Sequence, residues 1–321
     1  MFKKSYIFPL IMAICCCLIM IVQPASAKEW PSKPITVVVP YAAGGDGDLT
    51  ARLWADFAEK KLGQPILVVN KVGGGGMTGT NFAAKSSPDG YTLFLAQAGP
   101  VLLTPNMTKT TYSFDSFDYV SRIFVGNCAL VVHSSAPWNN LTEFFADAKA
   151  NPNKYSFASP GSTTWLSFAI RDLVKKAEVD FKFVEFQGGA PAVTAVLGEH
   201  ATFTFCFPQN YATQLKAGNL KVLGIAEETP DVPGVKSFAD QGFQGSYYGW
   251  AGIAAPKGVP APILEKLDAI TKEISADPDF IAKAKNMQAT PAYLSQSDWL
   301  PVLQEQNQAL GKVLEELGLK K

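Results

Sequence analysis

The stretch ITVVVPYAAGGDGDLTARLWADFAEKKL, residues 35–62, decides the fold that this sequence predicts. Its β-branched run from Ile35 to Val39 predicts a strand, and a Gly-rich turn follows. From Leu49 to Leu62 apolar residues recur at helical spacing, which predicts a helix that ends at Gly63. A strand, a turn and a helix in this order form the first half of a βαβ unit.

The same alternation continues along the chain. Strands predicted at residues 66–69 and 92–96 flank a helix predicted at 78–85, so the class is α/β, with parallel strands and right-handed crossovers. A second series follows, and its first helix opens with Asn140 and Glu143, a variant of the capping box. This series has strands at 129–133, 155–158, 181–186, 202–206 and 220–226 and further helices at 163–176, 190–197 and 209–217, before a strand at 252–255 and helices at 262–275, 278–286 and 297–317.

The composition is that of a folded chain. It has 321 residues, 47% hydrophobic and 17% charged, with 28 basic and 28 acidic side chains, and this balance argues against nucleic acid as a partner. The length suits about two domains, and no tandem repeat or low-complexity linker separates them. We therefore expect residues 28–126 and 246–321 to form a discontinuous domain 1 and residues 127–245 to form domain 2.

The first 27 residues predict a secretory signal peptide. Lys3 and Lys4 precede an apolar run from Ile7 to Val22, and a small-residue triplet ends at Ala27. The alternative is an uncleaved membrane anchor, but the run is shorter than the roughly 20 residues that a membrane span needs. We expect cleavage after Ala27 and export of the mature chain.

Export leaves two cysteines, because three of the five lie in the signal peptide. Cys128 and Cys206 both stand in apolar stretches with strand character. Two buried thiols and a single disulfide are both compatible with an oxidising compartment, so the sequence leaves this pairing open.

One glycine motif is similar to a dinucleotide-binding motif. Gly74-x-Gly76-x-x-Gly79 follows a strand and precedes a helix, as a dinucleotide fingerprint does. The next strand ends at Gln97 and lacks the acidic residue that would bind a ribose, and no Lys completes a phosphate-binding loop. We interpret the motif as a turn where backbones approach closely, and we expect no cofactor.

Catalytic and metal-binding patterns are sparse. His133 and His200 stand alone, and no HExxH, CxxC or Gly-x-Ser-x-Gly pattern occurs, so we expect neither a metal site nor catalytic residues. Asp46 and Asp48 could be imagined as a catalytic pair, yet the first turn of a helix favours acidic residues through the helix dipole. We therefore predict that the protein is not an enzyme.

Three turns remain as candidate binding elements, because each joins a predicted strand to a predicted helix. They span residues 40–48, 159–164 and 187–190 and are rich in Gly or Ser. A helix start leaves several N–H groups unpaired and carries about half a positive charge, so it can hold a carboxylate without Arg or Lys. Ligands of open α/β sheets bind at the carboxyl ends of their strands, where these turns lie.

Several ordered motifs resemble one known family, the Bug-type extracytoplasmic solute receptors of tripartite tricarboxylate transporters. The resemblance covers about Trp30 to Gly318. It rests on Trp30-Pro-x-Lys-Pro34, Pro40-Tyr-x-x-Gly-Gly-x-x-Asp-x-x-Ala-Arg52, Val69-Asn-Lys-x-Gly73, Pro88-Asp-Gly-Tyr-Thr92, Phe186-Gln-Gly-Gly-Ala-Pro191, Leu197-Gly198, Lys216-Ala-Gly218, Trp250-x-Gly and Ala255-Pro256.

The resemblance implies a type II periplasmic-binding-protein fold, often described as a Venus flytrap. Two α/β lobes with mainly parallel sheets flanked by helices would close over a ligand in the periplasm. The implied partners are a small organic anion and membrane transporter subunits, and we expect the protein to be a monomer. The implied ligand-binding residues are Tyr41, Ala43, Gly44, Gly45 and Asp48 in the first lobe and Ser159, Gly161, Ser162, Thr163, Gly188, Gly189 and Ala190 in the second.

Two positions depart from the family pattern. Trp165 stands where such receptors often have His, and Cys206 stands where many carry Asp, and we count both among the expected ligand-binding positions. Without a carboxylate at Cys206, an ammonium group would lack its partner there, so an amino-acid ligand is disfavoured. The aromatic residues Tyr41, Trp165, Phe205, Phe207 and Trp250 lie on or beside the expected cleft segments.

The predicted function is capture of a small organic carboxylate, of the aromatic or the dicarboxylic class, and its delivery to a tripartite tricarboxylate-type transporter. Stacking on an aromatic side chain would favour a flat ring over citrate. The alternatives are an exported enzyme that acts on small organic acids and a module that reports ligand occupancy to a membrane kinase.

Overall fold

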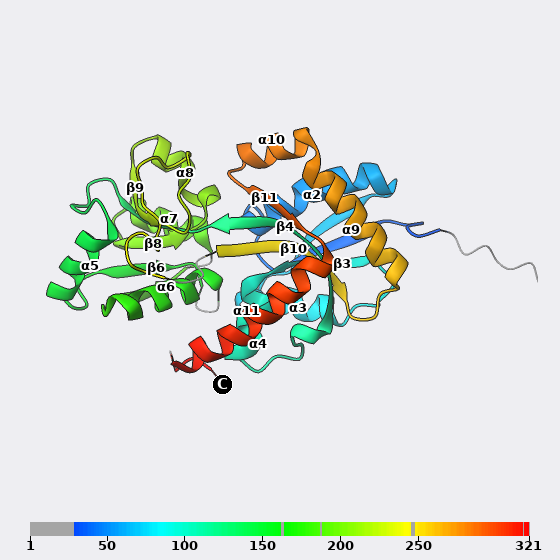
Figure 1. Ribbon diagram of the computed structural model, residues 1–321, viewed down its shortest axis with the longest axis horizontal. Coiled ribbons are helices and arrows are strands. Elements are labelled where there is room, and N and C mark those ends of the chain that lie inside the picture. Colours follow the sequence, from blue (N-terminus) through cyan, green and yellow to red (C-terminus); the bar gives the residue numbers. More distant parts are fainter. Residues whose placement is uncertain (1–28, 162–163, 187, 245–247, 317, 321) are drawn as a thin grey trace, which may run out of the picture.

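The computed structural model describes residues 29–161, 164–186, 188–244, 248–316 and 318–320. The predicted signal peptide, residues 1–27, lies outside the described residues. Two α/β units lie side by side, and strands run between them in the middle of the molecule (Figure 1). Among the described helices none is long and apolar enough to cross a membrane.

The first unit is built on a six-stranded sheet in the order β11-β4-β10-β3-β1-β2. Strand β1 runs parallel to β2 and β3, whereas β10 is antiparallel to β3 and β4, and β11 is antiparallel to β4. The strands are β1 (Ile35–Val39), β2 (Ile66–Asn70), β3 (Thr92–Gln97), β4 (Phe117–Asn127), β10 (Tyr248–Pro256) and β11 (Thr290–Leu294).

Helices cover both faces of this sheet because its strand residues alternate between two apolar clusters. Val37 and Leu93 belong to one cluster, with Trp54 of α2, and Val38 and Phe94 belong to the other. In Figure 1, α2, α9 and α10 lie above the sheet and α3, α4 and α11 below it. The bounds are α2 (Asp46–Leu62), α3 (Met77–Ala84), α4 (Thr104–Met107), α9 (Ala261–Ala276), α10 (Pro278–Asn286) and α11 (Gln296–Glu316).

The second unit is built on a five-stranded sheet in the order β7-β6-β8-β5-β9. Strand β6 is parallel to β7 and β8, and β5 is antiparallel to β8 and β9. The strands are β5 (Ala129–His133), β6 (Ser156–Ser159), β7 (Lys182–Glu185), β8 (Phe203–Cys206) and β9 (Leu220–Ile225), and the helices are α5 (Leu141–Ala150), α6 (Trp165–Ala177), α7 (Gly189–Leu197) and α8 (Pro208–Lys216).

The α/β class and the two-sheet architecture agree with the prediction, but the sheets are mixed rather than mainly parallel. The reason is that β4 continues directly into β5 of the other sheet, through Asn127 and Cys128, without a helical crossover. The chain then returns to the first sheet as β10, which is antiparallel to both of its neighbours. Consecutive parallel neighbours need a crossover connection, which is usually a helix.

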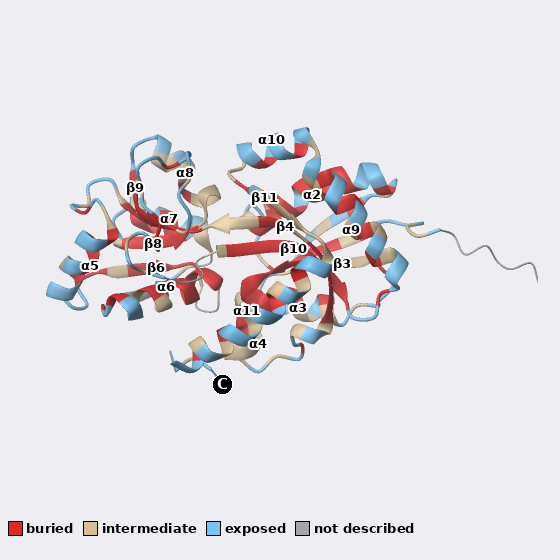
Figure 2. Ribbon diagram, viewed as in Figure 1, coloured by how far each residue is buried: buried red, intermediate tan, exposed pale blue. Residues whose placement is uncertain are grey.

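We call the six-stranded unit the first lobe and the five-stranded unit the second lobe. The first sheet takes its strands from residues 35–127 and 248–294, and the second takes its strands from 129–225. The domain limits at residues 126 and 245 stay a prediction. Figure 2 shows that buried residues concentrate on the strands and on the inner faces of the helices in both lobes.

The two cysteines are free thiols, which decides the question that the sequence left open. Ala129 pairs with Cys206 across β5 and β8, so Cys128, one residue earlier, points to the opposite face of the sheet. Accordingly, Cys128 packs in the apolar cluster with Phe205, and Cys206 packs in the cluster on the other face. Burial raises the pKa of both thiols.

Candidate functional site

The first-lobe turn between β1 and α2 is held in shape by Asp48. Its buried carboxylate accepts hydrogen bonds from the N–H of Gly44 at 2.9 Å, from Arg52 Nε at 3.0 Å and from Asn70 Nδ2 at 3.0 Å. Although burial raises it, the pKa of the Asp48 carboxyl is held below its usual value by Arg52, the Gly44 amide and Asn70. Asp48 is 2% exposed, so it holds the turn in shape from the buried side.

The main-chain N–H groups of this turn are less available than the sequence predicted. The Gly44 N–H is taken by Asp48, and the Gly45 N–H donates to the carbonyl of Ala42 at 3.3 Å. Ala43 is exposed, and its N–H has no partner among the described residues. Helix α2 begins at Asp46 without a side-chain cap, so the amides of its first turn are the donors at this point.

Asp46 itself occupies those amides. Its half-buried carboxylate interacts with the N–H groups of Asp46 and Gly47, and it accepts a hydrogen bond from Gln97 Nε2 at 3.3 Å. Burial raises the pKa of Asp46 in spite of these donors. The sequence predicted that an acidic residue suits this helix start. It did not indicate Gln97, the last residue of β3, which lies beside the turn.

Tyr41 adds an aromatic side chain to the same place. Its hydroxyl donates to the carbonyl of Gly75 at 3.3 Å, and its own carbonyl accepts from Asn70 Nδ2 at 2.9 Å. Burial, and after it the charge of Asp46, raises the pKa of Tyr41. The structure therefore brings Tyr41, Asp46 and Gln97 together at the carboxyl ends of β1 and β3.

The second-lobe turn after β6 uses its described polar groups internally. Ser159 is fully buried, lies 2.7 Å from Ser167 Oγ and donates to Glu185 at 3.2 Å. The N–H of Gly161 donates to Ser159 Oγ at 3.3 Å, and Thr164 caps α6 by accepting from the Ser167 N–H at 3.3 Å. The expected ligand-binding residues Ser162 and Thr163 lie outside the described residues.

The turn after β7 offers the more available donors of the second lobe. Helix α7 begins at Gly189 after Gly188, and no side chain caps it. Gly189 lies against Asn210 of α8, where an added Cβ would be 2.4 Å from Asn210 Oδ1. Among the described residues the Asn210 side chain has no hydrogen-bond partner. Sequence reasoning missed Asn210, although its place one turn after a strand end was the available signal.

The two positions that depart from the family pattern are both buried. Trp165 is 7% exposed and packs on Phe168 in an apolar cluster that also contains Trp250 and Trp299 of the first lobe. Cys206 is fully buried in an apolar cluster of the second lobe. Trp165 therefore belongs to a contact between the lobes, and neither side chain presents a surface to a ligand in this structure.

The crossing between the lobes is packed around Phe207. A Cβ added at Gly126 or at Gly249 would lie 2.3 Å or 2.4 Å from the Phe207 ring, so only glycine fits at these two points of β4 and β10. Beside them, Asn127 Nδ2 donates to the carbonyl of Glu227 at 2.8 Å, and Asn127 Oδ1 accepts from the N–H of Glu227 at 2.9 Å. These contacts fix the path from β4 into β5.

The turns of the two lobes stay separate in this structure. Asp46 contributes to the electrostatic environment of Cys128, which places the start of α2 near the crossing strands. None of the hydrogen bonds among the described residues joins residues 41–48 to residues 159–161 or 188–190. The candidate site is thus two separate sets of groups, one on each lobe.

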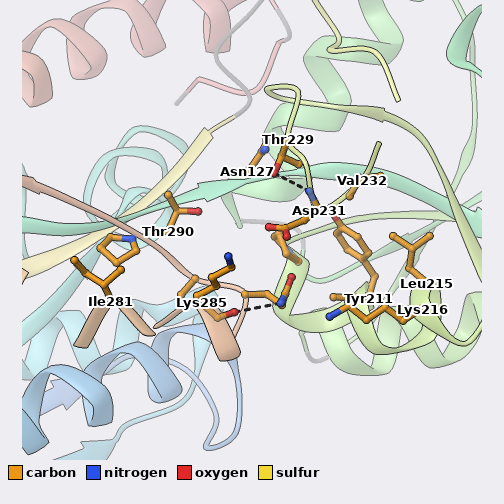
Figure 3. Close-up of a pocket in the computed structure, with 15 residues that line it drawn as sticks. Asn127, Tyr211, Leu215, Lys216, Thr229, Asp231, Val232, Ile281, Lys285 and Thr290 are labelled. Atoms are coloured by element: carbon orange, nitrogen blue, oxygen red, sulfur yellow. Dashed lines mark hydrogen bonds between the residues drawn. The ribbon is translucent and has the colours of Figure 1, made fainter. Parts of the chain in front are cut away.

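A pocket of about 250 Å³ also lies between the lobes, beside Asn127 of β4 (Figure 3). Tyr211 and Leu215 of α8 line it from the second lobe, and Ile281 and Lys285 of α10 line it from the first. No residue of the expected ligand site lines it. Across the described part of the chain, no group of three or more His, Cys, Asp or Glu residues could hold a metal ion.

Comparisons with known proteins agree with this architecture. The family model "Tripartite tricarboxylate transporter family receptor" matches residues 50–319. A UPF0065 protein encoded in the gbd 5' region of Cupriavidus necator is 32% identical over 303 residues, which cover 92% of this chain and 91% of that protein.

Two solved structures share the fold. The periplasmic binding protein BugD superimposes with a TM-score of 0.83 at 27% identity, over 91% of this chain and 100% of that one. MatC from Rhodopseudomonas palustris, solved with bound malate, gives a TM-score of 0.80 at 28% identity, over 89% of this chain and 100% of that one. Both are similar to this chain in its two-lobed, type II periplasmic-binding fold, and the chain belongs to the tripartite tricarboxylate transporter receptor family, whose Bug-named members are periplasmic solute-binding proteins.

Proposed function

We propose that this protein is an exported, non-enzymatic receptor that captures a small organic carboxylate between its lobes and delivers it to a membrane transporter. The observation that carries the proposal is the uncapped start of α7, where the amides of Gly189 and Ala190 and the side chain of Asn210 are available to an anion. A helix start of this kind binds a carboxylate without a basic residue. The structure of MatC with malate, a dicarboxylate, supports the ligand class.

The expected site residues take different roles in this proposal. Tyr41, Ala43, Gly44 and Gly45 form the first-lobe wall, and Asp48 positions them. Gly161, Gly188, Gly189 and Ala190 form the second-lobe wall, and Ser162 and Thr163, which lie outside the described residues, stay expected ligand-binding residues. Ser159 and Cys206 support that wall from behind, and Trp165 carries the apolar contact between the lobes.

Among the five aromatic residues of the cleft segments, only two are placed to meet a ligand. Tyr41 and Phe207 are half-buried, whereas Phe205, Trp165 and Trp250 are buried in apolar clusters. A flat or apolar part of the ligand would therefore contact Tyr41 or Phe207. This keeps aromatic acids and dicarboxylates together in the proposed ligand class.

The ligand class is tested by thermal unfolding with terephthalate, benzoate, succinate, malate and citrate, together with native mass spectrometry of whatever acid co-purifies. A ligand at a hundred times its dissociation constant adds about 2.7 kcal/mol to the free energy of unfolding, so a binding acid raises Tm clearly. We expect a dicarboxylate or an aromatic acid to do so. Stabilisation by citrate alone, or by none of the acids, would contradict the proposed ligand class.

The alternatives are tested by turnover and by partner. Incubation with the stabilising acid should leave it unchanged by NMR, because the Ser159 hydroxyl, which donates to the Glu185 carboxylate, is fully buried. A pull-down from detergent-solubilised membranes should recover transporter subunits with the ligand-loaded monomer. Mass spectrometry of the periplasmic form should show a chain that begins at Lys28, after cleavage at Ala27. Consumption of the acid, or recovery of a membrane kinase in place of a transporter, would overturn the receptor role.

A further inference from the structure

The first-lobe side of the candidate site carries an unbalanced negative charge. Asp48 is paired with Arg52 at 2.9 Å, whereas Asp46 has no ion pair among the described residues. Lys71, which follows β2, places its Nζ 4.1 Å from the centroid of the Phe82 ring. Among the described residues it forms no ion pair with Asp46. The start of α2 and one amide of Gln97 are thus the groups that offset the Asp46 charge.

The same place has hydrogen-bond acceptors but few free donors. Gln97 is 9% exposed, and while its Nε2 donates to Asp46, its Oε1 is buried with no partner in the part of the chain that the structure describes. The Asp46 carboxylate has lone pairs beyond those that Gln97 and the main chain use. A ligand carboxylate has no hydrogen to give to these oxygens and would be repelled by the Asp46 charge. A cationic nitrogen donates hydrogens and is attracted by that charge.

The second lobe offers the opposite chemistry. At the start of α7 the N–H groups of Gly189 and Ala190 are donors, and the helix end is electropositive. A ligand with a carboxylate at one end and a cationic nitrogen at the other would therefore meet a matching group on each lobe. It would also draw the lobes together, because each end is satisfied by a different lobe.

We infer that Asp46, with Gln97, selects a carboxylate ligand that also carries a cationic nitrogen, the nitrogen binding on the first lobe and the carboxylate on the second. This inference rests on the proposed function. It revises the expectation drawn from Cys206: the second lobe lacks an acidic partner for an ammonium group there, but Asp46 supplies one from the facing lobe.

The test uses pairs of acids that differ only in an amino group, with calorimetric titration of the purified protein at neutral pH. 4-Aminobutanoate is compared with butanoate, and 4-(aminomethyl)benzoate with 4-methylbenzoate. We expect the amino member to bind about 10- to 100-fold more tightly, the range that a hydrogen-bonded charge contributes. In Asp46→Asn, which keeps the shape and loses the charge, we expect that ratio to fall to about one, since no attraction for the ammonium remains. Asp56→Asn, an exposed position two to three turns further along α2, is the matched control and should keep the ratio.

The outcomes separate this inference from the proposed function. Equal or tighter binding of the amino-free acids by the unmodified protein, or an unchanged preference in Asp46→Asn, overturns the selectivity of Asp46 and leaves the carboxylate receptor intact. Failure of every acid, with or without an amino group, to bind either protein contradicts the receptor itself. Melting curves of both variants confirm that each is folded, and a loss of charge from a half-buried carboxylate is not expected to unfold the chain.

Discussion

At the scale of single residues, two carboxylates that stand two positions apart have opposite environments. Asp48 is buried among donors and paired with Arg52, which lowers its pKa, whereas the pKa of Asp46 is raised by burial. The first carboxylate is thus a fixed part of the turn. The Asp46 carboxylate can accept further hydrogen bonds, and no cationic side chain among the described residues pairs with it.

Asp48→Ala should destabilise the protein by about 1–3 kcal/mol, because it leaves Arg52, Asn70 and the Gly44 N–H without their buried acceptor. Since the pKa of Asp48 is lowered in the folded state, its contribution is fully present above the ordinary value of 3.8. It is lost as the pH falls through the folded-state pKa.

The measurement is urea unfolding of the variant and the unmodified protein between pH 7 and pH 3. The difference between them should shrink at the acid end. Asp56→Ala on the same helix is the control, because its side chain is exposed and should change little. Equal stability of Asp48→Ala and the unmodified protein at neutral pH would show that this carboxylate does not hold the turn.

The sequence predicted where the turns lie but not how their atoms are used. The glycines of the first turn were expected to present free N–H groups, and the structure shows those of Gly44 and Gly45 already bonded. That depends on the side chain of Asp48 folding back over the turn, which no spacing rule reveals. Gln97 and Asn210 were missed for the same reason, since each joins the site only through packing of another strand or helix.

At the scale of elements, the helix starts around the candidate site fall into two kinds. Helix α6 is capped by Thr164, whereas α2 and α7 begin after glycines that offer no side-chain acceptor. A capped start has one donor fewer for a ligand, and an uncapped start keeps it. The binding capacity of the second lobe therefore lies with α7 rather than with the described part of the turn before α6.

Thr164→Ala should lower the free energy of unfolding by about 1 kcal/mol, the usual effect of removing an N-cap hydroxyl. The hydroxyl of Thr164 accepts from the Ser167 N–H and donates to the carbonyl of Gly161 at 2.8 Å, so both ends of the turn lose a bond. Thr164→Ser is the matched control and should retain most of the stability. Chemical denaturation of the three proteins checks this, and equal loss in both variants would assign the effect to packing of the methyl group.

Most elements could be predicted because their periodicity agrees with their tertiary setting. The cap of α5 is an example: Asn140 Oδ1 accepts from the Glu143 N–H at 2.9 Å, as the capping pattern predicts. Strands β4 and β11 were missed because their residues do not alternate regularly. Strand β11 contains Pro291 and is an edge strand, held in part by Arg122 Nε, which donates to the carbonyl of Ala292 at 2.8 Å.

At the scale of the whole molecule, the lobes contact each other at two separate places. Phe207 packs on the glycines of the crossing strands, and on another side α6 meets α11, where Lys175 Nζ donates to the carbonyl of Glu316 at 2.8 Å. The order of strands and helices indicated two lobes. The contacts between the lobes could not be read from it, because they join residues that are 42, 81 and 141 positions apart in the sequence.

The pocket of Figure 3 lies between the lobes, beside Asn127 of β4, and none of the described residues of the binding turns lines it. In the first sheet, β4 and β10 separate β11 from β3, β1 and β2, and in the second, β5 separates β9 from β8, β6 and β7. The turns follow β1, β6 and β7, whereas the pocket is lined by Thr290 and Pro291 of β11, by residues after β9 and by α8, which follows β8. We therefore expect a rotation that closes the turns over a ligand to widen the pocket.

Ala212→Phe should then raise ligand affinity without touching the binding turns. Ala212 lines the pocket on α8, so a larger side chain there meets the first lobe when the cleft is open and is accommodated when it closes. A shift of about 1 kcal/mol toward the closed form would tighten apparent binding roughly fivefold. Thr213→Phe, which lies on the exposed side of the same helix, is the control and should leave affinity unchanged.

Calorimetric titration with the stabilising acid gives the affinities, and small-angle scattering without ligand gives the compactness of each variant. Tighter binding of Ala212→Phe together with a smaller radius of gyration would mean that the pocket and the cleft open in opposite directions about the crossing strands. Weaker binding would mean that closure narrows the pocket, and it would place the rotation axis elsewhere than between β4–β5 and β10. The same two measurements therefore decide where the hinge acts, since the variant alters a contact between the lobes and no group that meets the ligand.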